Sequence, residues 1–193
     1  MAVLAGGAAR RHRLVFAWSV AEATCWPIMP DAVLVPLAVA RPIEWWSLGL
    51  VAAAGSSVGG LVSYTVGRAA PVRPLLARLP LVRPPMVAAA DAWLANEDAA
   101  GLRHQPLSGL PFKVFAVLAG DRRIALGPFL CWAVVARGSR FLTACGLAGL
   151  LGRRVTHLLD CYPWPLLALW TGIFLLGLRR AVLMWERRDA ERS

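Results

Sequence analysis

The sequence predicts an all-α polytopic membrane protein, and two observations lead to that prediction. The chain of 193 residues is 58% hydrophobic, whereas soluble domains lie nearer to about 45–50% apolar residues. Residues 45–67 carry no charge, and neither do residues 161–178, while a spanning helix needs about 20 apolar residues. We expect one membrane domain over residues 1–193, with its core at about 14–178.

Apolar blocks at residues 14–40, 45–67, 124–152 and 158–178 are long enough to be considered as crossings. The block at 105–120 is shorter and contains Pro111. Proline inside a helix removes a backbone donor and clashes with the preceding turn. We therefore expect spanning helices together with Pro-broken re-entrant segments, in which the chain enters the membrane and returns to the same side.

The net charge of +10 comes from cations that border the apolar blocks, including a basic C-terminal tail at 179–193. Arginine-rich segments remain in the cytoplasm, so we expect both termini and the connection 68–104 on the cytoplasmic side. The basic residues are arginine everywhere except Lys113, which is typical of GC-rich coding and indicates a bacterial inner membrane. This distribution disfavours nucleic acid and favours lipids with anionic or phosphate headgroups as partners.

The connection 68–104 has apolar side chains at helical spacing on both sides of Pro80, Pro84 and Pro85. The pattern predicts two short helices that lie on the membrane surface. A loosely ordered loop is the alternative.

Two carboxylates, Glu22 and Asp31, lie within an apolar stretch that is broken by Pro27 and Pro30. An unpaired charge at the bilayer centre costs roughly 2.5–3.5 kcal/mol. On one continuous helix the two acids would face opposite sides, whereas a proline break lets both face one aqueous pocket. In the alternative interpretation, Glu22 lies at the membrane interface and Asp31 caps the helix 31–40.

Three basic residues also lie inside apolar segments. Lys113 follows Pro111, and it either pairs with Glu22 or Asp31, holds a phosphate, or extends to the interface. Arg137 and Arg140 are three residues apart and share a face if that segment is helical. Their guanidinium groups suit phosphate or carboxylate oxygens. The alternative is a loop between two half-helices.

Small residues and a weak internal repeat complete the pattern. Gly55, Gly59 and Gly60 have the spacing typical of close helix packing. Pro30 and Pro111 each precede an apolar stretch, and some positions recur at an offset of 78 residues, which would suit an inverted repeat. The recurring positions are Leu48-Gly49 with Leu126-Gly127, and Gly60 with Gly138.

No catalytic or metal-binding pattern accompanies these features. Cys25, Cys131, Cys145 and Cys161 form no C-x-x-C pair, so we interpret them as small buried residues. The histidines are scattered and belong to no acidic cluster with metal-ligand spacing. We therefore expect no metal, no cofactor and no enzymatic activity.

Four runs, at residues 27–42, 45–68, 110–120 and 136–141, together resemble the DedA superfamily, also called VTT-domain or SNARE-associated Golgi proteins. The similarity is greatest to its short bacterial YqaA-type branch and covers about residues 21–152. It implies two opposed re-entrant segments with inverted symmetry. The membrane acids of the family would map to Glu22 and Asp31, and Arg137 and Arg140 belong to the YqaA-like variant. The fuller R-x-x-P-G-x-R pattern of the family is missing.

The resemblance implies movement of phospholipids or undecaprenyl phosphate across the bilayer, coupled to an ion gradient. We therefore expect a translocase for lipid or lipid phosphate, with protons as the coupling ion and a homo-oligomer as its assembly. One alternative is a scaffold for membrane assembly and homeostasis that transports nothing. The other is a membrane enzyme acting on lipid phosphates, which would need a nucleophile or a metal set.

Overall fold

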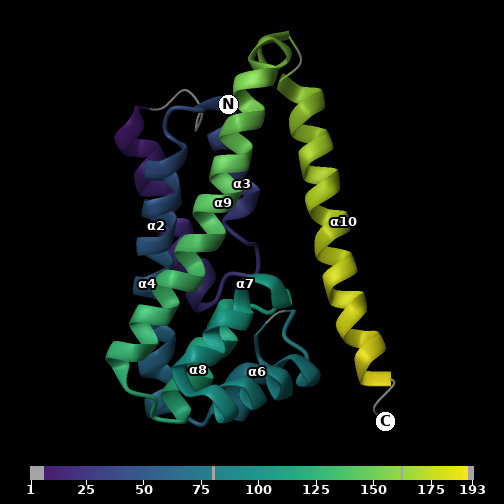
Figure 1. Ribbon diagram of the computed structural model, residues 1–193. Coiled ribbons are helices and arrows are strands. Elements are labelled where there is room, and N and C mark those ends of the chain that lie inside the picture. Colours follow the sequence, from purple (N-terminus) through teal and green to yellow (C-terminus); the bar gives the residue numbers. More distant parts are fainter. Residues whose placement is uncertain (1–6, 80, 162, 191–193) are drawn as a thin grey trace.

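The computed structural model describes residues 7–79, 81–161 and 163–190, and within these ranges it contains helices and no strand (Figure 1). The predicted all-α class is confirmed. Two long helices form the centre, α4 (Trp45–Ala69) and α9 (Leu126–Cys161). Gly49 of α4 lies against Leu142, and Ser56 is hydrogen-bonded to Arg137. Residue numbers therefore fall along α9 as they rise along α4, and the two helices are antiparallel.

Helix α4 and the segment Leu126–Arg154 of α9 are both long and apolar enough to cross a membrane. Their outer faces carry exposed apolar side chains, such as Val58 and Val62 on α4 and Leu147 and Leu150 on α9. A wide exposed apolar surface marks an interaction site or a membrane-facing region. On length and composition, these are the two candidate spanning helices of the described chain.

The first apolar block forms a hairpin of two helices, α2 (Ala8–Thr24) and α3 (Asp31–Ala40). Arg11 pairs with Glu44 at the start of α4, and Ser63, near the end of α4, donates to the carbonyl of Ala23. Helix α2 is therefore parallel to α4, and α3 must return the chain to the end where α2 began. The break at residues 25–30 reverses the chain, whereas a single crossing by residues 14–40 would require the chain to continue in one direction.

The second half begins with α5 (Val72–Ala77) and α6 (Pro84–Glu97), which confirm the two helices predicted in the connection 68–104. A 3-10 helix η1 (Asp98–His104) and a short α7 (Gln105–Ser108) then lead to α8 (Phe112–Asp121). Helix α8 is buried over residues 112–120. Gly60 of α4 lies against Phe112, and Gly67 lies against Val117. Helix α8 is therefore parallel to α4.

Each short helix packs along the long helix of the other half of the chain. Helix α3 lies mainly on α9, and α8 lies mainly on α4. Helices α3 and α8 have ten residues each. The first residues of α3 and α8 are 81 positions apart, as are those of α4 and α9. The two halves thus repeat a short helix followed by a long one.

The register of this repeat differs from the offset of 78 expected from the matched glycines. Gly49 lies against Leu142 and Gly60 against Phe112, whereas Gly127 and Gly138 have no such neighbour within 4 Å. The matched glycines therefore occupy different environments. The structural repeat follows the starts of the helices, which Pro30 and Pro111 set as N-caps. It does not follow the small residues, and the offset therefore shifts from 78 to 81 positions.

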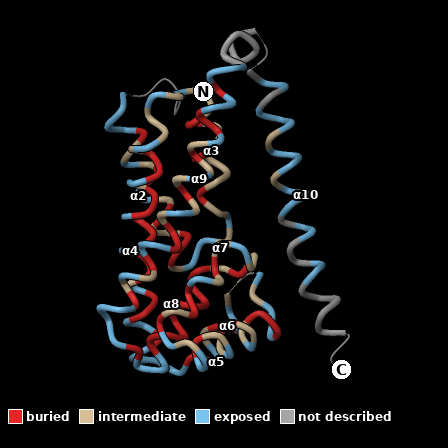
Figure 2. The backbone as a smooth tube through the Cα atoms, in the orientation of Figure 1, coloured by how far each residue is buried: buried red, intermediate tan, exposed pale blue. Residues whose placement is uncertain are grey.

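The last helix, α10 (Pro163–Ala190), runs back beside α9 and stands apart from the rest of the bundle (Figure 1). Figure 2 shows its described part as mostly exposed, whereas the buried residues gather in α8 and on the inner faces of α2, α4 and α9. It has few contacts, which are with α3, α6 and α9. It is the least embedded long helix of the described chain.

The start of α2 and the end of α10 lie at opposite ends of the molecule in Figure 1, and α5 and α6, labelled in Figure 2, lie toward the end where α10 finishes. A bilayer perpendicular to α4 would separate the start of α2 from the end of α10. With the bilayer in that orientation, the two ends of the chain would lie on opposite sides, which differs from the expected placement of both termini on one side. The α2–α3 hairpin accounts for the difference, because it returns the chain to the end at which α2 began.

Candidate functional site: a buried charge cluster where two hairpins meet

Arg137 lies at the centre of the molecule, in the middle of α9, and is only 2% exposed. Helix α9 is continuous through this position, so the alternative of a loop between two half-helices is wrong. Its Nη2 donates to Oε2 of Glu22 at 2.5 Å, and its Nε donates to Oγ of Ser56 at 2.7 Å. One side chain of α9 therefore joins α2 and α4.

Two aromatic rings enclose the same guanidinium. The Cζ of Arg137 lies 5.1 Å from the ring centre of Phe112 and 4.6 Å from that of Phe141. The two rings belong to separate apolar clusters, one around α8 and one around α3. A cation next to the face of an aromatic ring is attracted by the ring quadrupole. The ion pair of Arg137 with Glu22 thus lies between the two halves of the core.

A second ion pair lies one turn further along α9. Nη2 of Arg140 donates to Oδ2 of Asp31 at 2.7 Å and lies 3.4 Å from Sδ of Met29. The side chains of Arg140 and Asp31 are 21% and 13% exposed. Asp31 begins α3, and that helix end has no side-chain capping bond. The carboxylate of Asp31 therefore serves the ion pair rather than a cap.

Lys113 lies in the first turn of α8 and is 2% exposed, which contradicts an interfacial position in this fold. Its Nζ donates to the backbone carbonyl of Trp26 at 2.8 Å. A partner among the acids was one of the alternatives for Lys113, but Glu22 and Asp31 are bonded to the two arginines. Lys113 instead joins the start of α8 to the break in the first hairpin.

The break at residues 25–30 is stabilised by side chains from other helices. Pro27 and Pro30 prevent a regular helix there, so backbone carbonyls lose their helical donors. Lys113 serves the carbonyl of Trp26, and Nε1 of Trp18 donates to the carbonyl of Ile28 at 3.2 Å. Pro111 has the matching position before α8, as its N-cap.

The break in the α2–α3 hairpin and the start of α8 thus meet α9 at the five charged residues that the sequence singled out. Two carboxylates, Glu22 and Asp31, face three cations, so the cluster has a formal charge of +1 when all five groups are ionised. The Coulomb interactions of Arg137 extend to Glu22, Arg140 and Asp31, and those of Lys113 extend to Glu22. The cations are Lys113, Arg137 and Arg140.

The predicted packing glycines position the acid-bearing helix. A Cβ added at Gly55 would lie 2.5 Å from the carbonyl oxygen of Phe16, and one at Gly59 would lie 2.5 Å from that of Val20. Gly60 instead faces the ring of Phe112. The absent side chains let α2 approach α4 closely, which brings Glu22 within reach of Arg137.

Several site residues were not identified from the sequence. Ser56 is one of several serines among glycines, and the carbonyl of Trp26 has no sequence signal at all. Phe112 directly precedes Lys113, and Phe141 directly follows Arg140. The sequence therefore shows that each ring is close to a charged residue. Their position on either side of Arg137 was not, because it depends on how the two halves pack.

Other polar groups lie outside this cluster. Cys25 and Cys131 are exposed and only Cys145 is buried among the described cysteines, so the expectation of buried cysteines is wrong for two of them; the side chain of Cys161 lies outside the described residues. Among the described residues, no three His, Cys, Asp or Glu side chains gather as a metal site.

Comparison with known proteins gives one informative similarity. A protein of Haemophilus influenzae, named as an uncharacterized protein, is 29% identical over 150 residues, which cover 75% of this chain and 77% of that protein. No protein-family model matches the chain, and no solved structure matches it significantly. The chain thus has a bacterial relative of similar extent, and the name of that relative states no activity.

Proposed function

We propose that this protein is a bacterial inner-membrane translocase that moves a lipid with an anionic or phosphate headgroup across the bilayer. The observation that carries the proposal is the buried cluster with one cation more than its carboxylates. An excess buried cation is costly unless it is paired or neutralised. A monoanionic headgroup would supply the missing charge.

The arrangement of the hairpins supports a transport fold of opposed re-entrant segments. The α2–α3 hairpin comes from one end of the molecule, α7 and α8 lead in from the other, and they meet at Lys113 and Trp26. Transport sites near the bilayer midplane occur where such inverted repeats meet. We propose the same relation here, and with it membership of the DedA superfamily.

The bilayer would lie across α4, α9 and α10. Within the described residues, the end carrying α5 and α6 has more arginines than the other end. They are Arg68, Arg73, Arg78, Arg83, Arg122, Arg123, Arg187 and Arg188, against Arg10, Arg11, Arg13, Arg41, Arg153 and Arg154. By the positive-inside rule, the end carrying α5 and α6 faces the cytoplasm, together with the C-terminus. The N-terminal end of α2 then faces the periplasm.

In the proposed mechanism, the headgroup competes with Asp31 for Arg140, which is the more exposed of the two arginines. Guanidinium groups bind phosphate and carboxylate oxygens with the same two-pronged geometry. The headgroup would then take the place of the displaced carboxylate on Arg140. We propose protons as the coupling ion, so that a pH gradient would drive headgroup movement.

One observation favours a scaffold instead. Arg137 is enclosed by Glu22, Ser56 and two rings, so its role is also consistent with joining three helices. A scaffold would tolerate loss of the partly exposed charges Asp31 and Arg140 but not bulk at Gly55 or Gly59.

The test is a flipping assay in liposomes with a panel of labelled phospholipids and a polyprenyl phosphate, with and without a pH gradient. We expect transport of an anionic lipid by the wild type. Asp31→Asn, Arg140→Gln and Lys113→Met should each lower the rate at least tenfold, whereas Arg13→Gln, at an exposed site on α2, should leave it unchanged. Undiminished transport by all three site variants would contradict the assignment. Turnover of a labelled lipid phosphate would indicate an enzyme.

A further inference from the structure

Helix α3 contains a proline that leaves a backbone carbonyl free to accept a hydrogen bond from α10. Pro36 lies inside α3 and has no backbone N–H, so the carbonyl of Ala32 lacks its usual donor four residues on. Nε1 of Trp170 donates to that carbonyl at 3.3 Å. A helix 138 positions away in the sequence therefore satisfies the carbonyl group that the proline frees.

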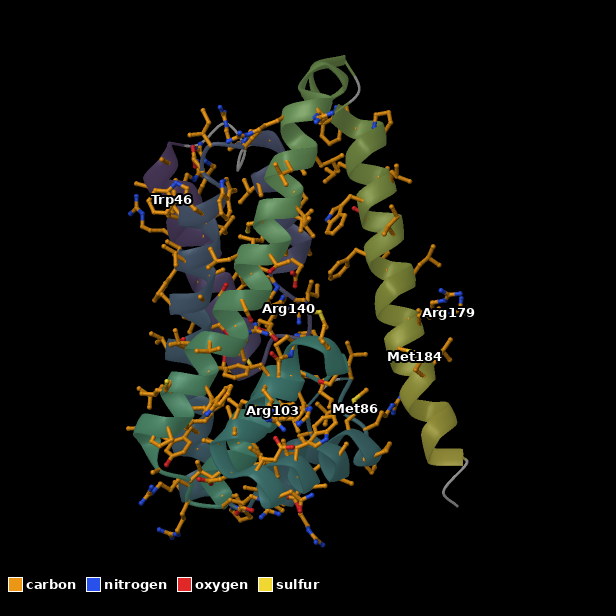
Figure 3. The ribbon with its side chains drawn as sticks, in the orientation of Figure 1. Trp46, Met86, Arg103, Arg140, Arg179 and Met184 are labelled. Atoms are coloured by element: carbon orange, nitrogen blue, oxygen red, sulfur yellow. The ribbon has the colours of Figure 1, made fainter. Side chains whose placement is uncertain are left out.

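This hydrogen bond is one of the contacts that attach α10 to the bundle, which α10 also touches through α6 and α9. Among the described side chains from Trp164 to Arg180, only Trp170 and Phe174 are partly buried, and the rest are exposed. The two rings are neighbours, with centres 6.1 Å apart. Figure 3 shows Arg179 pointing away from the rest of the molecule. Segments with few buried contacts open at low free-energy cost, so α10 can separate from α3 without unfolding of the core.

The attachment point is next to the more exposed end of the charge cluster. Ala32 directly follows Asp31, which is bonded to Arg140. Arg140 lies on the side of α9 that faces α10 (Figure 3). Asp31 and Arg140 are 13% and 21% exposed, whereas Glu22 and Arg137 are 5% and 2% exposed. The cluster is therefore most accessible on the side that α10 covers.

We propose that α10 is a lateral gate, held closed by the hydrogen bond from Trp170 to Ala32, and that the lipid reaches Arg140 between α10 and the α3–α9 pair. Exposed apolar side chains lie around α10, and they suit contact with acyl chains on both sides of this helix. These side chains include Leu167, Leu169, Ile173, Leu175 and Leu176. This inference deepens the proposed function. It rests on that function only for the identity of the molecule that passes between α10 and the α3–α9 pair.

Two variants should open the gate, one by changing the donor of this hydrogen bond and the other by changing the environment of its acceptor. Trp170→Phe keeps an aromatic ring and removes the N–H donor. Pro36→Ala leaves α10 untouched and gives Ala32 its own helical donor, which competes with Trp170. The matched control is Trp164→Phe, because Trp164 is on the same helix and 61% exposed.

The gate is measured by spin-label distances in nanodiscs, with the native cysteines replaced and labels at Val135 of α9 and Met184 of α10, which are 53% and 57% exposed. Removing one hydrogen bond shifts an equilibrium by about fivefold, so the population at longer distance should rise about fivefold in Trp170→Phe and Pro36→Ala. The control should match the parent.

A second measurement reports access to the site. A cysteine at Ala32 should react faster with a membrane-soluble maleimide in the Pro36→Ala background than with Pro36 intact. Unchanged distances and unchanged labelling in both variants would overturn the gate. Longer distances in a protein that flips no lipid in liposomes would support the gate and contradict the proposed translocation.

Discussion

Arg137 donates a hydrogen bond to Glu22 across 115 positions of sequence, and it does so between the rings of Phe112 and Phe141. The pair lies in the centre of the molecule, where the break in the first hairpin and the start of α8 meet. A single guanidinium therefore contacts α2, α4, α8 and α9. Both the stability of the fold and its proposed transport site depend on this residue.

The first prediction concerns how the buried ion pair of Arg137 with Glu22 affects the free energy of unfolding. Glu22→Leu should lower the unfolding free energy by about 3–5 kcal/mol, because it leaves a buried guanidinium without its carboxylate. Arg137→Met should lower it comparably. The double variant should be more stable than either single variant, since apolar side chains of similar volume can replace a buried pair at little cost.

Denaturant unfolding in detergent micelles measures these differences. Additive losses in the double variant would show that the two side chains do not interact. In liposomes the double variant should be inactive despite its recovered stability, if the pair also takes part in transport.

The second prediction compares two glycines of α9 under the same substitution. A Cβ at Gly152 would overlap the carbonyl of Val39 in α3, whereas one at Gly138 would meet nothing within 4 Å. Gly152→Ala should therefore destabilise by about 1–3 kcal/mol through overpacking. Gly138→Ala should stabilise by about 0.5–1 kcal/mol, because alanine favours the helix.

Thermal unfolding of the two variants, side by side, checks the contact of α3 with α9. Equal effects of the same sign would mean that α3 does not approach Gly152 as described.

The third prediction is that the two ends of the chain lie on opposite sides of the membrane. The α2–α3 hairpin returns to the end at which it began, so crossings by the candidate spanning helices α4 and α9 and, as proposed, by α10 would leave an odd number between the termini. Reporter fusions that are active only in the periplasm should give a signal at the N-terminus and none at the C-terminus. Signals from the same side at both ends would exclude this topology.

The fourth prediction concerns Glu97, at the end of α6. A hydrogen bond from His104 lowers the pKa of the Glu97 carboxyl below its ordinary value of 4.5, and the nearby Arg103 adds to this effect. A depressed carboxyl pKa contributes stability that is present above the ordinary value and is lost as the pH falls through the lower, folded value.

Wild type and Glu97→Gln should therefore differ in unfolding midpoint near neutral pH and converge in strong acid. In His104→Ala, the pKa of Glu97 should move back towards 4.5. An unchanged difference between wild type and Glu97→Gln across this acid range would contradict the interaction.

Most of the helices and the five charged residues of the site could be predicted from the sequence alone. Apolar length predicted α4 and α9, and the helix 31–40 was expected with the bounds that α3 has. Charges inside apolar segments identified Glu22, Asp31, Lys113, Arg137 and Arg140, because a charge there is costly unless something pairs with it. Both inferences use local properties of the chain.

Which charges pair, and which way each helix runs, depend on how the helices pack in three dimensions. The sequence left an acid partner, a bound phosphate and an interfacial position open for Lys113, whereas both carboxylates bind arginines of α9 and Lys113 binds the carbonyl of Trp26. The proline break was visible, but a break permits either a kink or a reversal. The reversal follows from α2 packing on the glycine face of α4, and that long-range contact sets the topology, the pairing and the position of the site together.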